Sequence, residues 1–541
     1  MNLTAKLLRK IQTALMLSLL CVFSISVSAH AQNGTKAQVN NGILSLSMNE
    51  VVRLTIRNNS NVATNYLQRV TQKFDLEKAE AKFEPVVNID GSFNAEAFQR
   101  NMRISDNGTQ TPASKWNAGA KASITQKIPT GGTLSFVWDN TYSENSDGTL
   151  TYDGDSSVSR AKTYTRESSS QWRIELTQPL LKGAGMDYNM ASIRLARITD
   201  KRNILSLRDN LSSLINTGLN LYFTFKQNAE NLEIQRQALE RSERLLEVNR
   251  FKQRMGRMAE SDVVQAEADV ASSRLSLEEA RNNLDESRRD LLNHLELSPD
   301  LQIAPVKDQI RDVQPDYEKC MQVALKNNQA YMDQKFKVTE TEISAMMVEN
   351  EREWQLDLKT GYSETQKIKN SYSASTSEDE LSAGVELTAP INLWGEDQLE
   401  RKKKLLSAAV EKRKAKLELK RGETDLQTKV ANAVRNVKMR WKMIGLAKIN
   451  TDLKAKQLEN ENTKLMVGRT TNFEVVSYQN QLVQAQLAET AKQISYVQAL
   501  LNLDQLLGTT METWHVKFKH DDKQLEEALN NEVRPLVWTW W

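Results

Sequence analysis

One internal repeat constrains the fold of this chain more than any other sequence feature. Residues 49–93 match residues 318–362 without a gap, at an offset of 269. Residues 176–180 match 387–391 at an offset of 211, so the first copy holds about 58 extra residues between 94 and 171. A sequence that carries the same pattern twice predicts two similar structural units, the first of them enlarged.

The first residues predict an export signal. Lys6, Arg9 and Lys10 precede an apolar run, and an A-x-A cleavage site ends at Ala31. Removing these three from the 72 basic residues leaves 69, which balances the 69 acidic residues and argues against a nucleic-acid-binding protein. No later apolar run is long enough for a transmembrane helix. An exported chain of this kind is periplasmic, secreted or a β-barrel of an outer membrane.

Alternating apolar and polar residues predict six β-strands, four in the first copy and two in the second. In 87–97, for example, Val87, Ile89 and Phe93 alternate with polar residues. Segments near ten residues with one apolar face are typical of a transmembrane barrel, although a soluble sandwich has the same pattern. We expect the polar stretches 99–115, 143–170 and 363–380 to be loops. Large aromatic residues near the predicted strand ends suit a membrane interface: Trp116, Trp138, Tyr142, Trp172 and Tyr362.

Six strands are too few to close a pore, because the smallest single-chain barrels have about eight. The barrel must therefore be shared between chains. With the strands placed, the chain divides into a signal peptide at 1–31, a first repeat at 32–312 with about four strands, a second repeat at 313–510 with about two, and a tail at 511–541.

Two very long helices are predicted, from Met186 to about Lys252 and from Glu396 to about Met466, because neither stretch contains proline. Each is followed by a glycine turn and a returning helix. The first returning helix has a strict heptad, which imposes a left-handed supercoil. Shorter helices near 62–83 and 331–352 could stack on the returning helices and form a straight-walled tube. The heptad positions are Val263, Val270, Leu277, Leu284 and Leu291.

Three stretches carry a family resemblance: Leu46 to Asn59, Leu176 to Gly183, and Val467-Gly468-Arg469 followed by Glu474-Val475-Val476. Their order, spacing and duplication over roughly 44–508 resemble the TolC-like outer membrane efflux proteins. The resemblance implies an α+β membrane protein, with an outer-membrane β-barrel shared between chains and a long periplasmic α-helical coiled-coil barrel. It also implies a homotrimer in a Gram-negative bacterium, contacting outer membrane lipid and docking onto a periplasmic adaptor (membrane fusion protein) joined to an inner-membrane transporter.

The implied function is the exit duct of a tripartite efflux or type I secretion system. Three chains of six strands would give eighteen, whereas four per chain is usual in the family. The extra hairpin either widens the barrel or projects from it, and we favour widening. The alternatives are a periplasmic adaptor, which normally has one helical hairpin, and a coiled-coil scaffold, which leaves the strands unexplained.

The resemblance also assigns roles to individual residues. It implies that Glu474 forms a ring of acids at the narrow inner end of the tube, and that Asp262 takes part in contacts there. A second family acid would fall at Ser477, where this chain departs. The strand-to-helix junctions are Gln178, Pro179 and Pro390, and we expect the prolines to end strand pairing. The helix turns that would meet the adaptor are Gly256, Arg257, Val467, Gly468 and Arg469.

Enzyme chemistry is not indicated. The mature histidines are scattered, and His294 occupies a heptad position, where packing is the simpler explanation. The chain has no glycine-rich phosphate loop, nucleophile elbow or zinc-binding helix motif. We therefore expect no catalytic residue, no metal and no cofactor.

Overall fold

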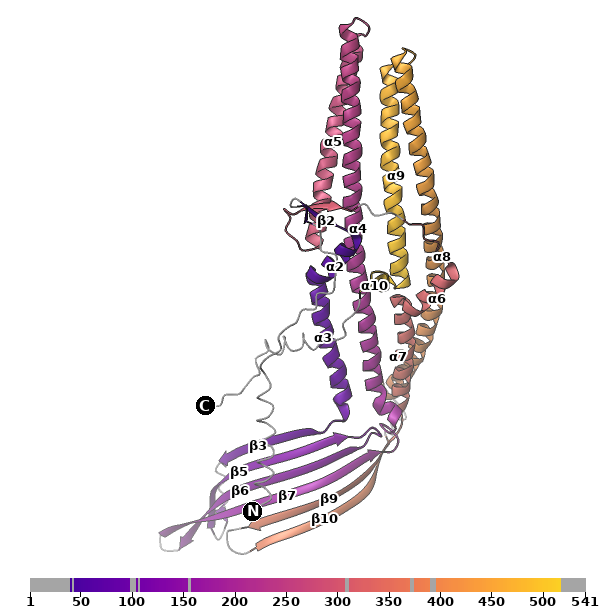
Figure 1. The fold of residues 1–541 in the computed structure, drawn as a ribbon. Helices are drawn as coiled ribbons and strands as arrows, with labels where there is room; N and C mark the ends of the chain where they lie inside the picture. Colours follow the sequence, from indigo (N-terminus) through magenta and orange to yellow (C-terminus); the bar gives the residue numbers. More distant parts are fainter. Residues whose placement is uncertain are drawn as a thin grey trace, which may run out of the picture.

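A computed structural model describes residues 39–40, 43–97, 104–105, 108–153, 157–306, 311–369, 374–389 and 396–516. The molecule is elongated, with a curved sheet at one end and two long helical hairpins that point away from it (Figure 1). The predicted signal peptide, Pro390 and the tail beyond residue 516 lie outside the described residues. None of the described helices is both long and apolar enough to cross a membrane.

Six long strands form one antiparallel sheet in the order β10-β9-β7-β6-β5-β3, which confirms the predicted strand count. A two-residue strand, β4, pairs only with β5. The extra β5–β6 hairpin lies within the sheet, between β3 and β7, and does not project from it. The strands are β3 (Val86–Ala97), β4 (Ile104–Ser105), β5 (Gly108–Lys127), β6 (Thr133–Asp153), β7 (Ser157–Pro179), β9 (Gln355–Lys369) and β10 (Ala374–Thr388).

The strand register aligns the apolar positions of all six strands on one face. Phe136 of β6 is opposite Ile124 of β5 and Ile174 of β7, and Ile174 is opposite Tyr362 of β9. Directly opposed residues point to the same side of a sheet, so the apolar face is continuous from β3 to β10. The other face carries the polar residues. Aromatic pairs follow the apolar face: Phe93 with Trp116, Trp116 with Tyr142, and Trp172 with Tyr362.

The expected loops are largely strand. β5, β6 and β7 have 20, 21 and 23 residues, whereas β3 has 12 and β9 and β10 have 15 each. Much of 99–115, 143–170 and 363–380 therefore continues the ladder, and the aromatic residues Trp116, Tyr142 and Trp172 lie inside strands and not near their ends. These extensions are rich in Thr and Ser on both faces. They lack the apolar alternation by which the strands were predicted, although Thr itself suits a strand.

The helices agree closely with the predicted pattern. α4 and α8 have 69 and 71 residues, and the returning helices α5 and α9 have 35 and 36. α3 and α5 both pack along α4, and α7 and α9 both pack along α8, as expected for stacked pairs. The bounds are α2 (Met48–Asn58), α3 (Ser60–Glu80), η1 (Ala81–Phe83), α4 (Met186–Arg254), α5 (Glu260–His294), α6 (Tyr317–Asn327), α7 (Gln329–Glu351), α8 (Glu396–Met466), α9 (Asn472–Leu507) and α10 (Thr510–Thr513).

Two equivalent cores lie near the middle of the helical part. The first joins α2, the middle of α4 and the end of α5, and Tyr222 in it donates to the carbonyl of Leu46 at 3.1 Å. The second joins α6, α8 and α9 around Val430 and Tyr496, which are fully buried. A small sheet covers the first core, with β1 antiparallel to β2 and β2 parallel to β8. Its strands are β1 (Val39–Asn40), β2 (Ile43–Leu46) and β8 (Gln302–Pro305).

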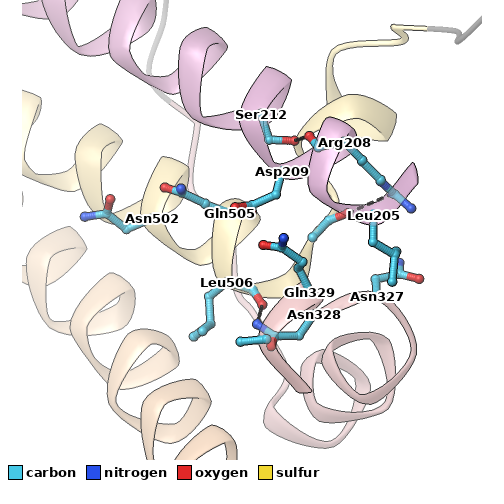
Figure 2. A pocket seen from close by; sticks show the side chains of 12 residues that line it. Leu205, Arg208, Asp209, Ser212, Asn327, Asn328, Gln329, Asn502, Gln505 and Leu506 are labelled. Atoms are coloured by element: carbon cyan, nitrogen blue, oxygen red, sulfur yellow. Dashed lines mark hydrogen bonds between the residues drawn. The ribbon is translucent and has the colours of Figure 1, made fainter. Parts of the chain in front are cut away.

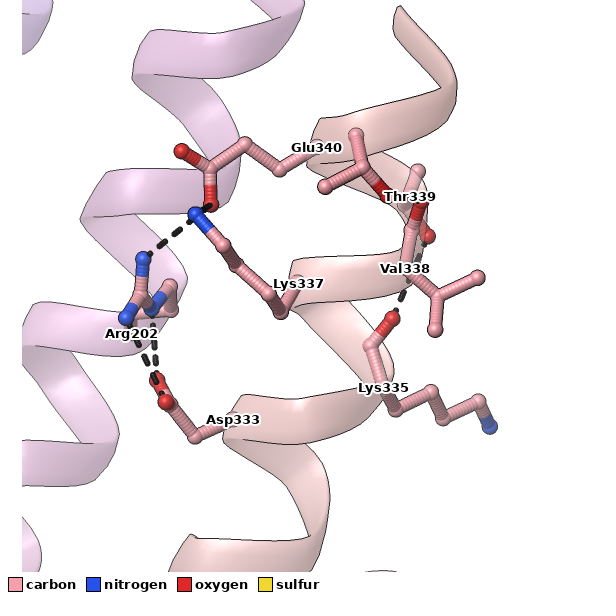
Figure 3. A network of polar contacts seen from close by, with 8 residues as sticks. Arg202, Asp333, Lys335, Lys337, Val338, Thr339 and Glu340 are labelled. Atoms are coloured by element: carbon pink, nitrogen blue, oxygen red, sulfur yellow. Dashed lines mark hydrogen bonds and ion pairs between the residues drawn. The ribbon is translucent and has the colours of Figure 1, made fainter. Parts of the chain in front are cut away.

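The two repeats are tied together between the cores and the sheet. Arg202 of α4 donates to Asp333 of α7 at 2.5 Å and to Glu340 one to two turns further on at 3.4 Å (Figure 3). Lys337 reaches the same Glu340 carboxylate at 3.2 Å. These side chains are partly exposed, so each pair contributes little stability, but together they set the register of α7 against α4.

Candidate functional site

The two helix turns at the end far from the sheet have the same geometry. Gly256 and Gly468 adopt φ values of +70° and +73°. In each turn the residue after the glycine donates its N–H to a carbonyl five residues earlier, Arg257 to Lys252 and Arg469 to Lys464, both at 2.9 Å. This is the left-handed glycine that ends many helices. A Cβ atom built on either glycine would meet no atom within 4 Å, so both turns face open space.

The tips of the two hairpins contact one another. The Lys252 ammonium lies 3.5 Å from the carbonyl of Leu465, and the amide of Asn472 lies 3.6 Å from the sulfur of Met258. Apolar side chains from three helices fill the space behind them. The tips also expose large apolar side chains to solvent, which is unusual for a surface that has no partner. The buried residues are Leu245, Leu458, Val475 and Leu482, and the exposed ones include Met255, Met466, Val467 and Phe473.

The structure brings the two predicted acids to this same end. Asp262 lies in the first turn of α5 and Glu474 in the first turn of α9, and both are exposed. Thr471 caps α9 by accepting from the N–H of Glu474 at 3.3 Å, and the Thr470 hydroxyl donates to the Glu474 carboxylate. A carboxylate in the first turn of a helix also interacts favourably with the helix dipole, so each acid contributes to the stability of its own helix.

A third acid, which the sequence reasoning missed, lines a groove beside Ser477. The groove has a volume of about 620 Å³ and runs over α9 between α5 and α8. Asp269 enters it from α5 and accepts from Gln265 at 3.3 Å, and burial raises the pKa of its carboxyl. The sequence spacing could have identified Asp269, because it is seven residues after Asp262 and the two therefore share one face of α5.

The side chain of Gln178 forms hydrogen bonds that stabilise the junction between the sheet and the helices. Its amide donates to the carbonyls of Thr130 and Pro179 at 3.3 and 2.8 Å, and its oxygen accepts from the Thr130 hydroxyl at 2.9 Å. Thr130 begins the tight turn to Gly131, which has φ +102°. A Cβ on Gly131 would lie 2.3 Å from the carbonyl oxygen of Gly183, so this turn and the start of α4 are closely packed.

β7 and its register with β9 end at Pro179, as predicted, although two backbone hydrogen bonds continue past the proline. Leu180 and Lys182 still donate to the carbonyls of Leu356 and Trp354, at 2.7 and 3.1 Å. N–H groups of alternate residues point to opposite neighbours in an antiparallel sheet. The missing N–H of Pro179 is on the β6 side, where the register ends at Thr133 opposite Thr177.

The repeated asparagine pair forms a joint at the middle of each repeat. Asn59 caps α3 and donates to the carbonyl of His294, at the end of α5, at 2.8 Å. Asn328 caps α7 and donates to the carbonyl of Leu506, at the end of α9, at 2.9 Å. In each repeat the second asparagine of the pair thus lies at the break between the two short helices and binds this break to the end of the returning helix. The sequence showed the pair but not this role.

A polar pocket of about 350 Å³ lies beside the second joint (Figure 2). Arg208 of α4 donates to the carbonyl of Gly508 and to Glu512, both at 2.8 Å. Half-buried Asp209 faces the pocket, and burial raises the pKa of its carboxyl. These polar groups mainly hold the end of α9 against α4. The Nε2–H of His294 donates to the carbonyl of Leu214 at 3.1 Å, as a packed residue would, and no metal-binding group of His, Cys, Asp or Glu occurs in the described ranges.

Comparison with known proteins gives a family match for part of the chain. Residues 148–295 match the family described as outer membrane efflux protein. This segment covers the end of β6, the whole of β7, α4 and α5, and the first helix tip. A search of curated proteins finds no match.

Solved structures match over most of the chain. The outer membrane protein VceC from Vibrio cholerae has a TM-score of 0.59 at 12% identity, covering 85% of this chain and 96% of that one. The CmeC outer membrane channel from Campylobacter jejuni has a TM-score of 0.59 at 13% identity, covering 94% and 98%. The open state of the MtrE outer membrane channel from Neisseria gonorrhoeae has a TM-score of 0.59 at 12% identity, covering 85% of this chain and 88% of that one. At these identities the likeness establishes the fold.

Proposed function

We infer that this chain, an outer membrane efflux protein with the TolC-like fold, is the exit duct through which an efflux system passes cargo out of a Gram-negative cell. The observation that carries this inference is the six-stranded sheet with one continuous apolar face, joined directly to two long helical hairpins. The match of residues 148–295 to the outer membrane efflux protein family also favours a channel over an enzyme. Neither an adaptor nor a coiled-coil scaffold accounts for such a sheet.

The working unit is a homotrimer. β3 and β10 are the two edges of the sheet, and each is paired on one side only within the described residues. In a membrane, a sheet cannot leave an edge unpaired, because no water is present to satisfy its backbone groups. Pairing β10 of one copy with β3 of the next closes the sheet, and three copies give eighteen strands. The in-plane position of the β5–β6 hairpin favours this wider barrel over one of twelve strands.

The two glycine tips are the docking surface for a periplasmic adaptor, which links the duct to an inner-membrane transporter. Gly256, Arg257, Val467, Gly468 and Arg469 lie at the end opposite the sheet, where the hairpins finish. Open space beside both glycines and exposed apolar side chains around them support a docking role.

The same end forms the constriction of the tube. In the trimer, Glu474 supplies a three-fold ring of carboxylates, and Asp262 contributes at the tip contacts. Asp269 takes the place of the acid that is missing at Ser477, because both residues line one groove. Concentrated negative charge in a narrow opening attracts cations and disfavours anions.

Planar-bilayer conductance of the purified protein tests the proposed function. A trimeric duct that is nearly closed at its inner end should insert and give small, steady, cation-selective current steps in a salt gradient. A protein that does not insert into membranes at all would refute the channel and return the scaffold interpretation to first place.

A further inference from the structure

A second groove, which none of the roles above uses, lies where the sheet meets the helices. It has a volume of about 530 Å³, within the range of small-molecule sites. We call it the junction groove. It lies at the helix-side end of β9 and β10, next to the last register pair, Gln355 and Thr388. Its charged and hydroxyl-bearing walls come from the loop after β7, the first turn of α4, the end of α7, the end of β10, and the second and third turns of α8.

The junction groove carries a net positive charge, and most of its cations form no ion pair within the part of the chain that the structure describes. Lys182, Arg352, Arg401 and Lys404 line it, against two acids, Glu351 and Glu353. Lys404 pairs with Glu400 at 3.4 Å, whereas the other three cations form no ion pair with any residue that the structure describes. Because the cations outnumber the acids that line the groove, an anion bound between the cations would be attracted to them.

A protonated hydroxyl completes the set of donors. Burial, and then the neighbouring carboxylate of Glu351, raise the pKa of the Tyr188 phenol. Tyr188 therefore keeps its proton, and its hydroxyl can donate to an anion. Guanidinium, ammonium and hydroxyl donors around one cavity are the groups that bind phosphate oxygens.

Exposed apolar residues are next in the chain to residues that line the junction groove. Trp354, between Glu353 and Gln355, is 58% exposed, and its carbonyl accepts from the N–H of Lys182, so the backbones of these two residues are adjacent in the fold. Leu180 and Leu181 are exposed beside them. Tryptophan and basic residues gather at the level of lipid headgroups, where an apolar body and a polar tip are both satisfied.

The groove is separate from the apolar face that α8 presents elsewhere. Leu399 and Leu406 are exposed and seven residues apart, so they share one face of α8. Arg401 is two residues after Leu399, about 200° further round the helix, and so points the opposite way. The cations therefore face α7 and α4 of their own chain, and a neighbouring copy on the apolar face of α8 leaves the groove accessible.

We propose that the junction groove binds the phosphate group of an anionic phospholipid in the periplasmic leaflet of the outer membrane. The proposal rests on the proposed function, because the sheet must lie in that membrane for the groove to be at headgroup level. Binding would fix the depth of the sheet in the bilayer, with the acyl chains along the exposed apolar side chains and the phosphate between Arg352 and Arg401.

The test uses the full-length protein in neutral detergent, with lipid binding counted by native mass spectrometry. We expect phosphatidylglycerol to bind more tightly than phosphatidylcholine. The double variant Arg352→Gln/Arg401→Gln should bind phosphatidylglycerol about a hundred-fold more weakly or worse, the loss expected for two charge-assisted hydrogen bonds. The matched control, Arg413→Gln/Lys414→Gln, removes the same charge from α8 outside the groove and should bind as the unmodified protein does.

Equal binding of the two lipids would overturn the proposal, and so would an equal loss of binding in the control variant. Complete displacement of the lipid by inorganic phosphate at the same concentration would also overturn it, because it would indicate a site for free phosphate. Conductance of the same preparations in neutral bilayers reports on the proposed function separately. If the double variant conducts normally and still binds phosphatidylglycerol as the unmodified protein does, the groove alone is refuted. If the unmodified protein fails to insert, both proposals are refuted.

Discussion

Replacing Gly468 by Trp and by Ala separates the docking role of the tip from its role as a helix turn. Both variants place a Cβ on a residue with φ +73°, which costs about 1–2 kcal/mol for any side chain. Neither side chain meets another atom of the chain at its Cβ, because the space within 4 Å is empty. The two variants should therefore fold equally well, and the difference between them should come from outside the chain.

The size of that difference follows from the three-fold assembly. Forcing bulk into a packed contact typically costs about 1–3 kcal/mol, and a trimer presents three such tips, so docking should weaken by about 3–9 kcal/mol. At about 1.4 kcal/mol per factor of ten, that is at least about a hundred-fold in affinity for the adaptor. We expect the Trp variant to lose transport and the Ala variant to retain most of it.

The assay is complementation of a strain that lacks this chain, with a compound to which the deletion makes the strain sensitive. Trimer in the outer membrane is quantified in parallel, since both variants must be present in equal amounts. Full resistance from the Trp variant at normal trimer levels would refute docking at the tip. Loss of resistance in the Ala variant would show that backbone strain, and not an occupied surface, explains the effect.

Three other predictions concern the constriction, the junction and the end of α9. Glu474→Gln removes three carboxylates from the trimer, so cation selectivity, read as the reversal potential in a salt gradient, should fall; an unchanged potential contradicts the ring. Gly131→Ala combines φ +102° with a Cβ 2.3 Å from the carbonyl oxygen of Gly183, so it should destabilise by about 2–5 kcal/mol and lower the melting temperature more than Gly468→Ala does. Burial raises the pKa of Asp504 above its ordinary 3.8. The folded state therefore holds this proton more tightly than the unfolded state, and the unfolding free energy should decrease as pH rises from about that value through the raised pKa. Asp504→Asn should remove that part of the slope, and an unaltered pH profile of unfolding would contradict it.

Local periodicity predicted most of the architecture. Period two placed Phe136 and Trp138 on the apolar face, and the register confirms this by setting them opposite Ile174 and Trp172. Period seven placed Val263 and Val270 inside the helical pairs, where both are buried. These predictions succeed because neighbouring residues in a strand or helix alone determine which side chains share a face.

Where the prediction was wrong or incomplete, the local structure depended on a neighbouring strand or helix that is distant in the sequence. The polar stretches around β5, β6 and β7 became strand because each has a neighbouring strand to pair with, not because of their own pattern. Backbone hydrogen bonding past Pro179 depends on which neighbour its missing N–H faces. The role of Asp269 depends on α9 lying against α5, beside Ser477.

The sequence by itself determined the duplication, the six strands, the four long helical segments and the two glycine turns. Most of these features are encoded by residues close together in the chain. Alternating apolar residues indicate the strands, heptads indicate the helices, and glycine, which tolerates positive φ, indicates the turns. The duplication is read from the repeat itself. Only the tertiary structure decided that the extra hairpin lies within the sheet, that asparagine caps lock the joints, and that Lys182, Arg352 and Arg401 surround one groove. These features join segments up to 235 residues apart, and contact between such segments is specified by packing and not by any local pattern.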